Sequence, residues 1–380
     1  MVTILGGELL CALGETPERT KRLHDATPEI ASMEVKIGEE TMHYPYYRID
    51  DKPRFSDTAI VDGYLERVVS ALMQKLGLEP SKMESVGVFM GSSSIDYSMA
   101  WPIEQSVDGD FVKSWKRERV GGGGYVDTLM RRFGFEGPSL TYNTACTSSA
   151  NALMDAASMI EGGIVDYALV LGVELYSPTT LEGFVMMQLV SPDAIRPFDA
   201  KRNGIVLGEA VSAVLLSRDD VASSPWRYLG GRSNCETYSV TGANPSGEGI
   251  AQVMRDALEE AGIESSAIDA VKAHGTASDL NDMAEMRGME QVFETIPPYL
   301  SLKPYIGHTL GGCGTAELLL MMECVDAGFI PASVNFETLD EAFAAAPITE
   351  RMAAGAGRYM LNYFGFGGNN TSFIVEKAAR

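Results

Sequence analysis

The sequence lacks several features that would place it in particular classes of protein. None of its 380 residues lies in a run of about 18 uninterrupted apolar residues, the length that spans a bilayer. The first segment, Met1 to Gly14, has no basic stretch before its apolar run. We interpret it as the first strand and turn rather than as a signal peptide. These absences favour a cytoplasmic protein without membrane insertion.

Cysteine is scarce and scattered. The five cysteines are odd in number and include no Cys-x-x-Cys pair: Cys11, Cys146, Cys235, Cys313 and Cys324. This pattern argues against a disulfide scaffold and against a zinc site, and it is typical of a reducing cytosol. Each cysteine, taken alone, is more often a small buried hydrophobic residue than a nucleophile.

The chain also has few positively charged residues relative to its negatively charged ones. The chain has 30 Lys and Arg against 52 Asp and Glu, a formal charge of −22, which makes nucleic acid a poor partner because phosphate binding needs a positive surface. One local exception is a basic cluster, defined as Lys113, Lys116, Arg117 and Arg119. It is either a solvated face or a docking site for an acidic protein.

Buried strands alternate with amphipathic helices along the chain. Apolar runs predict strands at 86–90, 165–173, 210–216, 268–273 and 371–375. Apolar residues three and four apart predict helices at 62–76, 149–161, 250–261 and 315–326. This alternation indicates an α/β fold in which helices cover a sheet. The charged and small residues of 217–226 are the best candidate for a boundary between two halves.

A thiol stands where an extended segment turns into a helix. The run Leu140-Thr-Tyr-Asn-Thr-Ala-Cys146-Thr-Ser-Ser-Ala150 ends in small residues, and the helical pattern continues to Glu161 before two glycines. Cys146 is therefore expected near the positive end of a helix dipole, which lowers a thiol pKa and exposes the sulfur to a ligand. The alternative is a structural cysteine at a helix start.

Histidine and a glycine-rich loop supply two further signals. His274 in Ala273-His274-Gly-Thr276 and His308 in Gly307-His308-Thr-Leu follow apolar runs and are flanked by small residues, so each is placed to face a pocket. Either could equally be a structural histidine. The stretch Gly365-Phe366-Gly-Gly368 is typical of a tight loop that brings backbone N–H groups close to a ligand, although a plain turn has the same composition.

Together these segments resemble the elongating β-ketoacyl-acyl carrier protein synthases of the thiolase superfamily. The matches run in family order from about residue 86 onward. They are Ala145-Cys146-Thr147-Ser148, Arg196-Pro-Phe-Asp199 with Arg202, Gly208-Glu209, His274-Gly-Thr276, Lys303 and His308 five residues apart, Glu317, and Gly365-Phe366-Gly-Gly. The resemblance implies a thiolase-like fold with a duplicated five-layered α-β-α-β-α arrangement. An N-terminal half, 1–220, would carry the nucleophile, and a C-terminal half, 221–380, would carry both histidines.

The resemblance also implies a reaction and its residues. Cys146 would accept an acyl group from an acyl carrier protein, and His274 and His308 would assist the decarboxylation of a malonyl-thioester whose carbanion attacks the acyl-cysteine. Because the initiating synthases have asparagine in place of the second histidine, His308 points to the elongating type. Backbone N–H groups of Cys146 and Phe366 would form the oxyanion hole.

Supporting roles follow from the same resemblance. Lys303 and Glu317 would organise the catalytic hydrogen bonds, Thr276 and Ser278 would contact the phosphopantetheine arm, and Phe366 would gate an acyl pocket. Phe184, with Met186 and Met187 after it, would line that pocket. The basic cluster becomes a candidate docking site for acyl carrier protein, which is acidic. The family forms dimers, so a homodimer or a heterodimer with a second ketosynthase-like subunit is expected, with no metal or bound cofactor.

Several residues depart from the family pattern. Asn203 stands in place of a usual aspartate, Lys272 where glutamate or asparagine is frequent, and Asn369 in place of threonine. These changes spare the catalytic set but favour a specialised pathway, polyketide or polyene, as much as fatty acid synthesis. Two alternatives remain open: a non-catalytic partner like a chain-length factor, and a thiolase using coenzyme A thioesters, which His308 and Lys303 disfavour.

Overall fold

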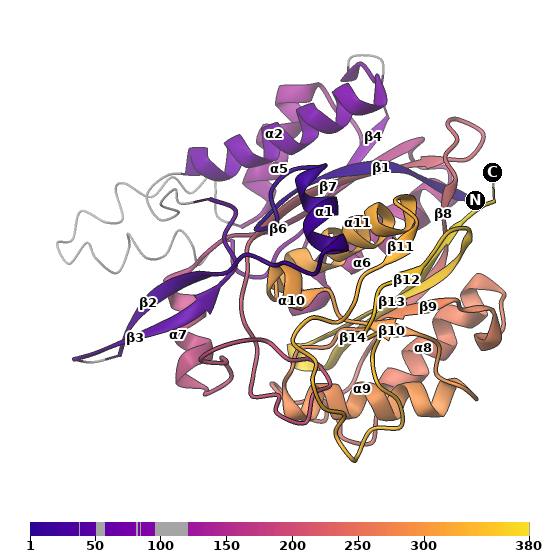
Figure 1. Cartoon of the computed structure of the whole chain (residues 1–380). Helices are drawn as coiled ribbons and strands as arrows, with labels where there is room; N and C mark the ends of the chain where they lie inside the picture. Colours follow the sequence, from indigo (N-terminus) through magenta and orange to yellow (C-terminus); the bar gives the residue numbers. More distant parts are fainter. Residues whose placement is uncertain (38, 51–57, 81–82, 84, 96–120, 380) are drawn as a thin grey trace.

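The computed structural model describes residues 1–37, 39–50, 58–80, 83, 85–95 and 121–379 (Figure 1). In this part of the chain, ten strands form one mixed sheet in the order β10-β9-β13-β14-β8-β1-β7-β6-β4-β5. Their bounds are β1 Val2–Cys11, β4 Val86–Gly91, β5 Ser139–Tyr142, β6 Tyr167–Glu174, β7 Ala210–Arg218, β8 Trp226–Cys235, β9 Ala270–Lys272, β10 Tyr299–Leu300, β13 Gly357–Gly365 and β14 Asn369–Lys377.

The sheet consists of two halves with the same strand directions. From β1 through β7, β6 and β4 to β5, the neighbouring pairs are antiparallel, antiparallel, parallel and parallel. From β8 through β14, β13 and β9 to β10, the sequence of pairings is identical. Within the sheet, and among the described residues, the two halves are joined where Val2 and Thr3 of β1 pair with Tyr228 and Arg227 of β8. This repetition is the duplication that the family resemblance implied.

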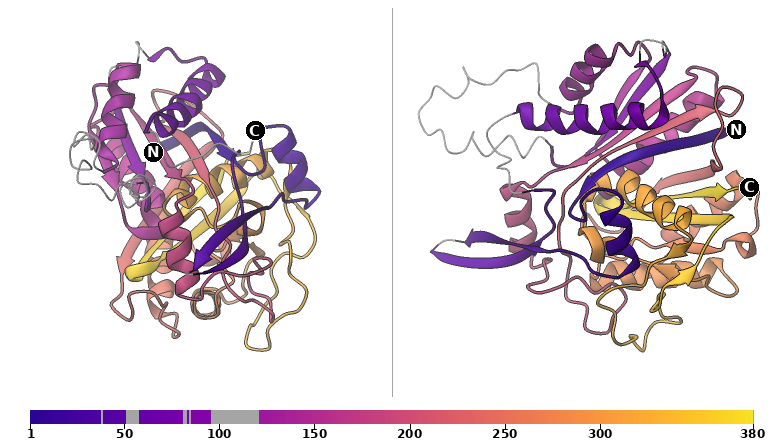
Figure 2. Two further views of the ribbon diagram at one scale, coloured as in Figure 1. Left: turned by 90° about the vertical axis from the view of Figure 1, so that its left-hand side faces the viewer. Right: turned by 45° about the horizontal axis from the view of Figure 1, so that its top comes forward.

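Six helices arrange these half-sheets into layers, as Figures 1 and 2 show. Helices α2 and α5 cover the outer face of the first half, α8 and α9 cover the outer face of the second, and α6 and α11 lie between the halves. Their bounds are α2 Thr58–Leu76, α5 Gly123–Phe133, α6 Ser148–Glu161, α8 Glu248–Ala261, α9 Asp279–Val292 and α11 Cys313–Asp326. The predicted five-layered thiolase-like α/β fold is confirmed.

Smaller elements surround these layers. They are the helices α1 Glu18–His24, α7 Pro178–Met186 and α10 Lys303–Ile306, the two-stranded sheets β2 Ala31–Ile37 with β3 Glu40–Tyr46 and β11 Phe329–Ile330 with β12 Met352–Ala353, and the single 3-10 turns η3 Ala145–Thr147, η4 Ser265–Ala267, η5 Leu310–Gly312 and η6 Phe366–Gly368. All nine strands and helices predicted from periodicity are present, with ends shifted by a few residues.

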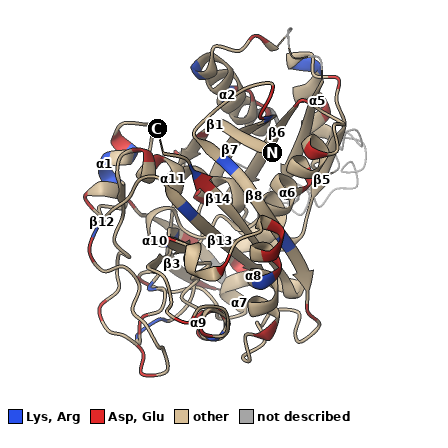
Figure 3. Cartoon of the chain, turned by 90° about the vertical axis from the view of Figure 1, so that its right-hand side faces the viewer, with Lys and Arg blue, Asp and Glu red and all other residues tan. Residues whose placement is uncertain are grey.

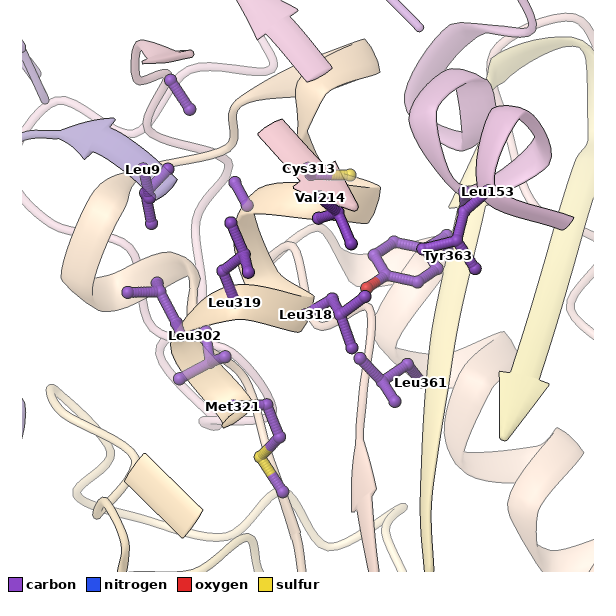
Figure 4. Close-up of a cluster of buried hydrophobic side chains, with 14 of the residues drawn as sticks. Leu9, Leu153, Val214, Leu302, Cys313, Leu318, Leu319, Met321, Leu361 and Tyr363 are labelled. Carbon is purple, nitrogen blue, oxygen red and sulfur yellow. The ribbon is translucent and has the colours of Figure 1, made fainter. Parts of the chain in front are cut away.

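The central helix α11 is largely apolar and buried, because both of its faces meet a half-sheet. All of its residues from Cys313 to Met322 are buried. Figure 4 shows Leu318 directed towards Leu361 and Tyr363 of β13, whereas Leu319 lies on the side of Leu9 of β1. Charged residues occur mainly along the outer helices and loops, and few of them lie in the strands (Figure 3). Among the described residues, no helix combines the length and hydropathy needed to cross a bilayer.

The two central helices approach each other at their first turns, where only glycine fits. A Cβ atom at Gly314 of α11 would overlap the backbone nitrogen of Ala150 in α6. We expect Gly314→Ala to lower the free energy of unfolding by about 1–3 kcal/mol, because the backbones must separate. Chemical denaturation measures this loss. Gly183→Ala in α7 is the matched control, since its Cβ would meet nothing within 4 Å. Equal stabilities of the two variants would contradict this close contact.

Candidate active site

The Cys146 thiol lies in a strained turn at the start of α6. Ala145 adopts a left-handed backbone conformation (φ 54°), which costs a non-glycine residue about 1 kcal/mol or more. Hydrogen bonds hold the turn: Ser148 Oγ donates to the carbonyl of Ala145 at 2.6 Å and accepts from the N–H of Thr144 at 2.9 Å. Asn151 Nδ2 donates to Thr144 Oγ1 at 2.9 Å. The expected strand-to-helix turn is present, and it fixes the direction of the thiol.

Both predicted histidines converge on this sulfur from the other half of the chain. His308, between α10 and η5, places Nε2 3.1 Å from Cys146 Sγ. His274 follows β9, and its ring lies 5.3 Å from that of His308 at an interplanar angle of 82°. The sulfur and one nitrogen of each ring lie within 4.8 Å of one another, and the three residues are 7%, 1% and 3% exposed. Residues 128 and 162 positions from Cys146 are thus assembled into one site.

Lys303 and Glu317 support the histidines from behind. Lys303 Nζ lies 3.3 Å from His274 Nδ1, 2.6 Å from the His274 carbonyl and 2.9 Å from Glu317 Oε1. Burial by itself lowers the pKa of Lys303, but the Glu317 carboxylate outweighs it and the net pKa is raised. An ammonium group only donates, so His274 Nδ1 accepts, which assigns the ring proton to Nε2. His274 therefore presents an N–H donor to the site.

Burial keeps both imidazoles neutral. It lowers the pKa of His274 and of His308 well below the usual histidine range, and the positive charges of Lys303 and Lys272 lower both further. A neutral imidazole can accept a proton at one nitrogen or donate a hydrogen bond from the other. The pair can therefore serve a nucleophile as a base and a developing oxyanion as donors.

The predicted lowering of the Cys146 pKa is wrong. Burial raises the pKa of this thiol to about 12, and Lys303 together with the backbone N–H groups of Phe366 and Cys146 opposes the shift only in part. The helix start was visible in the sequence, whereas the loss of solvent around the sulfur was not. Burial therefore favours the neutral thiol in the resting protein.

This thiol pKa has a measurable consequence. We expect the rate of Cys146 alkylation by iodoacetamide to rise about tenfold per pH unit from pH 7 to 10 without a plateau, because the thiolate fraction is still increasing. Intact-protein and peptide mass spectrometry follow the modification at Cys146 alone. A free thiol with an ordinary pKa of about 8.5 levels off within this range. A plateau for Cys146 below pH 8 would show that the thiol is activated in the resting protein.

The glycine-rich loop after β13 closes over the sulfur. A Cβ atom at Gly365 would lie 3.0 Å from the backbone nitrogen of Cys146, so a side chain there would displace the loop or the turn by a few tenths of an ångström. Gly367 and Gly368 adopt φ of 78° and 74°, which turn the loop so that Phe366 faces Phe184, their rings 5.6 Å apart. The N–H of Phe366 acts as a hydrogen-bond donor towards the Cys146 thiol, as does the N–H of Cys146 itself. Two backbone donors thus converge where an oxyanion could form.

A cavity of about 300 Å³ leads from the surface to the thiol. Cys146, His274 and His308 line its inner end, and it includes every residue predicted to contact the substrate: Phe184, Thr276, Ser278 and Phe366. Met186 and Met187 lie instead on the surface, with 66% and 45% of their areas exposed. The basic cluster Lys113, Lys116, Arg117 and Arg119 lies outside the described residues.

Two buried acids that the sequence analysis missed hold the His274 loop. Glu285 accepts the N–H groups of His274 and Gly275 at 2.7 and 2.8 Å, and Asp282 accepts the N–H of Thr276 at 2.9 Å. Both are in α9, three residues apart, and so on one helix face. In the sequence, the signal for them was a pair of acidic residues three positions apart, shortly after the turn that contains His274.

One set of side chains in the described part of the chain could offer three ligands to a metal ion, and it is Cys146, His274 and His308 themselves. The ammonium group of Lys303 lies 3.3 Å from one of these rings, and a positive charge there opposes a bound cation. The arrangement is better suited to an anionic intermediate than to a metal.

Comparisons with known proteins agree with this geometry. Residues 57–222 match the family described as "Beta-ketoacyl synthase, N-terminal domain", and residues 227–337 match "Beta-ketoacyl synthase, C-terminal domain". Similar chains include 3-oxoacyl-[acyl-carrier-protein] synthase II, chloroplastic, of Arabidopsis thaliana, 30% identical over 264 residues, which are 65% of this chain and 48% of that protein. The highly reducing polyketide synthase ALT1 of Alternaria alternata is 32% identical over 67% of this chain, which spans 10% of that protein.

Solved structures give the same result over the whole chain. A chain of the complex between a ketosynthase and its chain length factor from Xenorhabdus doucetiae superimposes with a TM-score of 0.87 at 26% identity, covering 99% of this chain and 98% of that one. A beta-ketoacyl synthase from Burkholderia phymatum gives 0.83 at 26% identity, with 100% and 99% covered. This chain spans less than two thirds of the length of the relatives compared by sequence above.

Proposed function

The chain belongs to the β-ketoacyl synthase family, whose members act in fatty acid and polyketide synthesis, and from this premise we propose that it is a condensing acyltransferase. It would catalyse decarboxylative Claisen condensation of an acyl-enzyme thioester with a malonyl group carried on acyl carrier protein. The observation that supports this most directly is the 3.1 Å contact between Cys146 Sγ and His308 Nε2 at the inner end of a cavity.

Acyl transfer is the first proposed step. Cys146 Sγ attacks the thioester carbonyl of the donor while its proton moves to His308 Nε2, and the tetrahedral oxyanion accepts the N–H groups of Cys146 and Phe366. The carrier thiolate leaves and takes up the proton, so the enzyme ends as a neutral acyl-thioester. Because burial disfavours a free thiolate at Cys146, the thiol would lose its proton only when the acyl donor is bound.

Condensation is the second step. The malonyl carboxylate leaves as carbon dioxide, and its electron pair forms an enolate whose oxygen accepts N–H donors of His274 and His308. The enolate carbon then attacks the acyl carbonyl and expels the Cys146 thiolate, which takes up one proton from water, the proton that the overall reaction consumes. Neutral imidazoles suit this role because each can donate one N–H, and Lys303 fixes the proton of His274 on Nε2. No metal or redox cofactor is needed, because both substrates are thioesters on phosphopantetheine.

The remaining site residues have supporting roles in this proposal. Glu317 holds Lys303, Thr276 and Ser278 line the outer cavity where a phosphopantetheine arm would lie, and Phe184 with Phe366 would separate that arm from the acyl chain. The basic cluster is proposed as the docking site for acyl carrier protein. The division into halves at 220/221 and the cytoplasmic location stay predictions.

We propose that the chain forms a dimer through the exposed edge strand β5. In the described part of the chain, β5 pairs only with β4, and its residues Ser139, Leu140 and Thr141 are exposed. An exposed edge with a 39% exposed leucine is suited to pair with another strand. The partner would be a second copy or a second ketosynthase-like subunit.

A non-catalytic partner of an active ketosynthase is the second candidate. It draws on the similarity to chains of the ketosynthase and chain length factor complex from Xenorhabdus doucetiae. The assembled Cys146, His274 and His308 favour the enzyme instead, because a subunit that only shapes a tunnel needs no such set.

One assay separates the two candidates. The purified protein is incubated with acyl carrier proteins bearing acyl groups of different lengths, and its intact mass is measured before and after malonyl-acyl carrier protein is added. An acyl adduct that disappears as β-ketoacyl product forms supports the enzyme and identifies the preferred chain length. A folded protein that takes no adduct from any donor would favour the partner role.

A further inference from the structure

A second buried lysine shares the carboxylate of Glu317. Lys272, the last residue of β9, places Nζ 2.5 Å from Glu317 Oε2, while Lys303 Nζ lies 2.9 Å from Glu317 Oε1. The three side chains have no exposed area. Each carboxylate oxygen therefore has its own ammonium partner, and the cluster contains two positive charges against one negative charge.

Lys272 is fixed by contacts that also reach the loop beside Cys146. Its Nζ donates to the backbone carbonyl of Asn362 at 2.6 Å and lies 3.6 Å from the centre of the Tyr363 ring. Both residues belong to β13, which ends at Gly365, next to the backbone nitrogen of Cys146. Burial lowers the pKa of Lys272, and the Glu317 carboxylate opposes this shift.

Two acidic groups beside the imidazoles lose their negative charge in acid, so they oppose this positive charge less as the pH falls. Glu285 of α9 accepts the N–H groups of His274 and Gly275, and burial raises its pKa to about 7. Asp282 of the same helix accepts N–H groups two residues further on, and its pKa is raised to about 6. Other titratable neighbours in the described part of the chain include the thiols of Cys146 and Cys313 and the phenol of Tyr363, which burial keeps neutral. Glu174 is a further one, and its carboxylate accepts five hydrogen bonds from Ser93, Ser94 and Gly311.

We propose that Lys272 is a positioning residue for the condensation step: it anchors Glu317 Oε2 and adds a second fixed positive charge behind His274 and His308, so that both imidazoles stay neutral N–H donors in acid. Lys303 orients the ring of His274 through direct contact. Lys272 acts indirectly, through its contact with Glu317 and through the electrostatic field of its positive charge. This role rests on the proposed condensing function. The downward pKa shifts of both histidines, to which Lys272 contributes, are in keeping with it.

Nuclear magnetic resonance of the histidine rings tests the proposal without requiring activity. The chain has only four histidines, of which the exposed His24 and His43 serve as references. In protein labelled at histidine Cε1, we expect His274 and His308 to remain neutral down to pH 5. In Lys272→Met, at least one of them should titrate about one pH unit higher, because a nearby positive charge has been removed. Lys201→Met, a 67% exposed lysine paired with Glu337, should shift neither.

Two further variants and the wild-type titration keep the test decisive if Lys272→Met does not fold. Lys272→Gln retains a donor for Glu317 without the charge and should give the same upward shift, whereas Glu317→Gln should shift the same rings downward. If neither Lys272 variant folds, the wild-type titration alone decides: an imidazole of His274 or His308 that titrates above pH 5 overturns the proposal. Unchanged ring titrations in a folded Lys272→Met would show a purely structural lysine and also overturn it.

The rate of condensation provides the functional measurement. The acid limb of its pH profile should move about one pH unit upward in Lys272→Met, together with the ring titration. A wild-type protein without condensation activity would reject the proposed function, and the ring titrations would still decide the role of Lys272. An unmoved acid limb in a variant whose rings have shifted would remove Lys272 from the reaction.

Discussion

Replacement of Cys146 by alanine is expected to abolish the acyl adduct and to lower the condensation rate by at least about 10⁴-fold, because the variant lacks the sulfur proposed to form the thioester. Cys146 Sγ is the sulfur that has both an imidazole at 3.1 Å and two backbone N–H donors. Cys313 lies close by, but its Sγ donates to the carbonyl of Cys146 at 3.0 Å and belongs to the buried start of α11. Intact-protein mass after incubation with acyl carrier protein donors measures the adduct, and product analysis measures condensation.

The control is Cys235→Ser, which removes an exposed thiol and retains a donor for the carbonyl of Gly367. It should acquire the adduct and form product as the wild type does. An adduct that persists in Cys146→Ala but disappears in Cys235→Ser would place the nucleophile on the surface. That result would remove the basis for the proposed reaction.

Replacement of His274 by alanine is expected to separate the two halves of the reaction. Acylation of Cys146 should fall by less than about tenfold, whereas condensation should fall by about 10²–10⁴-fold, the usual contribution of a positioned proton donor. The reason is geometric, since His308 provides the nitrogen that contacts the sulfur, and His274 is held by Lys303 to donate into the cavity. The alanine variant retains the backbone carbonyl that accepts from Lys303.

Rates of adduct formation by intact mass, and of product formation with malonyl-acyl carrier protein, measure the two steps separately. His43→Ala, at an exposed position of β3, is the control and should leave both rates unchanged. Equal losses in both steps of His274→Ala would mean that His274 acts already in acyl transfer. A loss of acylation alone would reverse the assignment of the two histidines.

Local sequence determined the catalytic residue types and the elements that bear them. The small residues around Cys146 predict a tight turn, and the structure has that turn with Ala145 in a left-handed conformation. The alternation of apolar runs predicts the sheet and its helices, because periodicity depends on which faces are buried. Gly365 and its neighbours predict a close backbone approach, which occurs at the nitrogen of Cys146.

The tertiary structure determined the spatial neighbours, the solvent exposure and the electrostatic environment of those residues. Cys146 follows β5 in one half, whereas His274 follows β9 and His308 follows α10 in the other. The packing of the two halves, including that of α6 against α11, therefore brings them within 4.8 Å. The thiol pKa reversed its predicted direction, because solvent exclusion by both halves outweighs the local helix start. The sharing of Glu317 by Lys272 and Lys303, 31 residues apart, was likewise absent from any motif. Burial and electrostatic fields depend on everything within several ångströms of a group, whereas sequence motifs report only on neighbours along the chain.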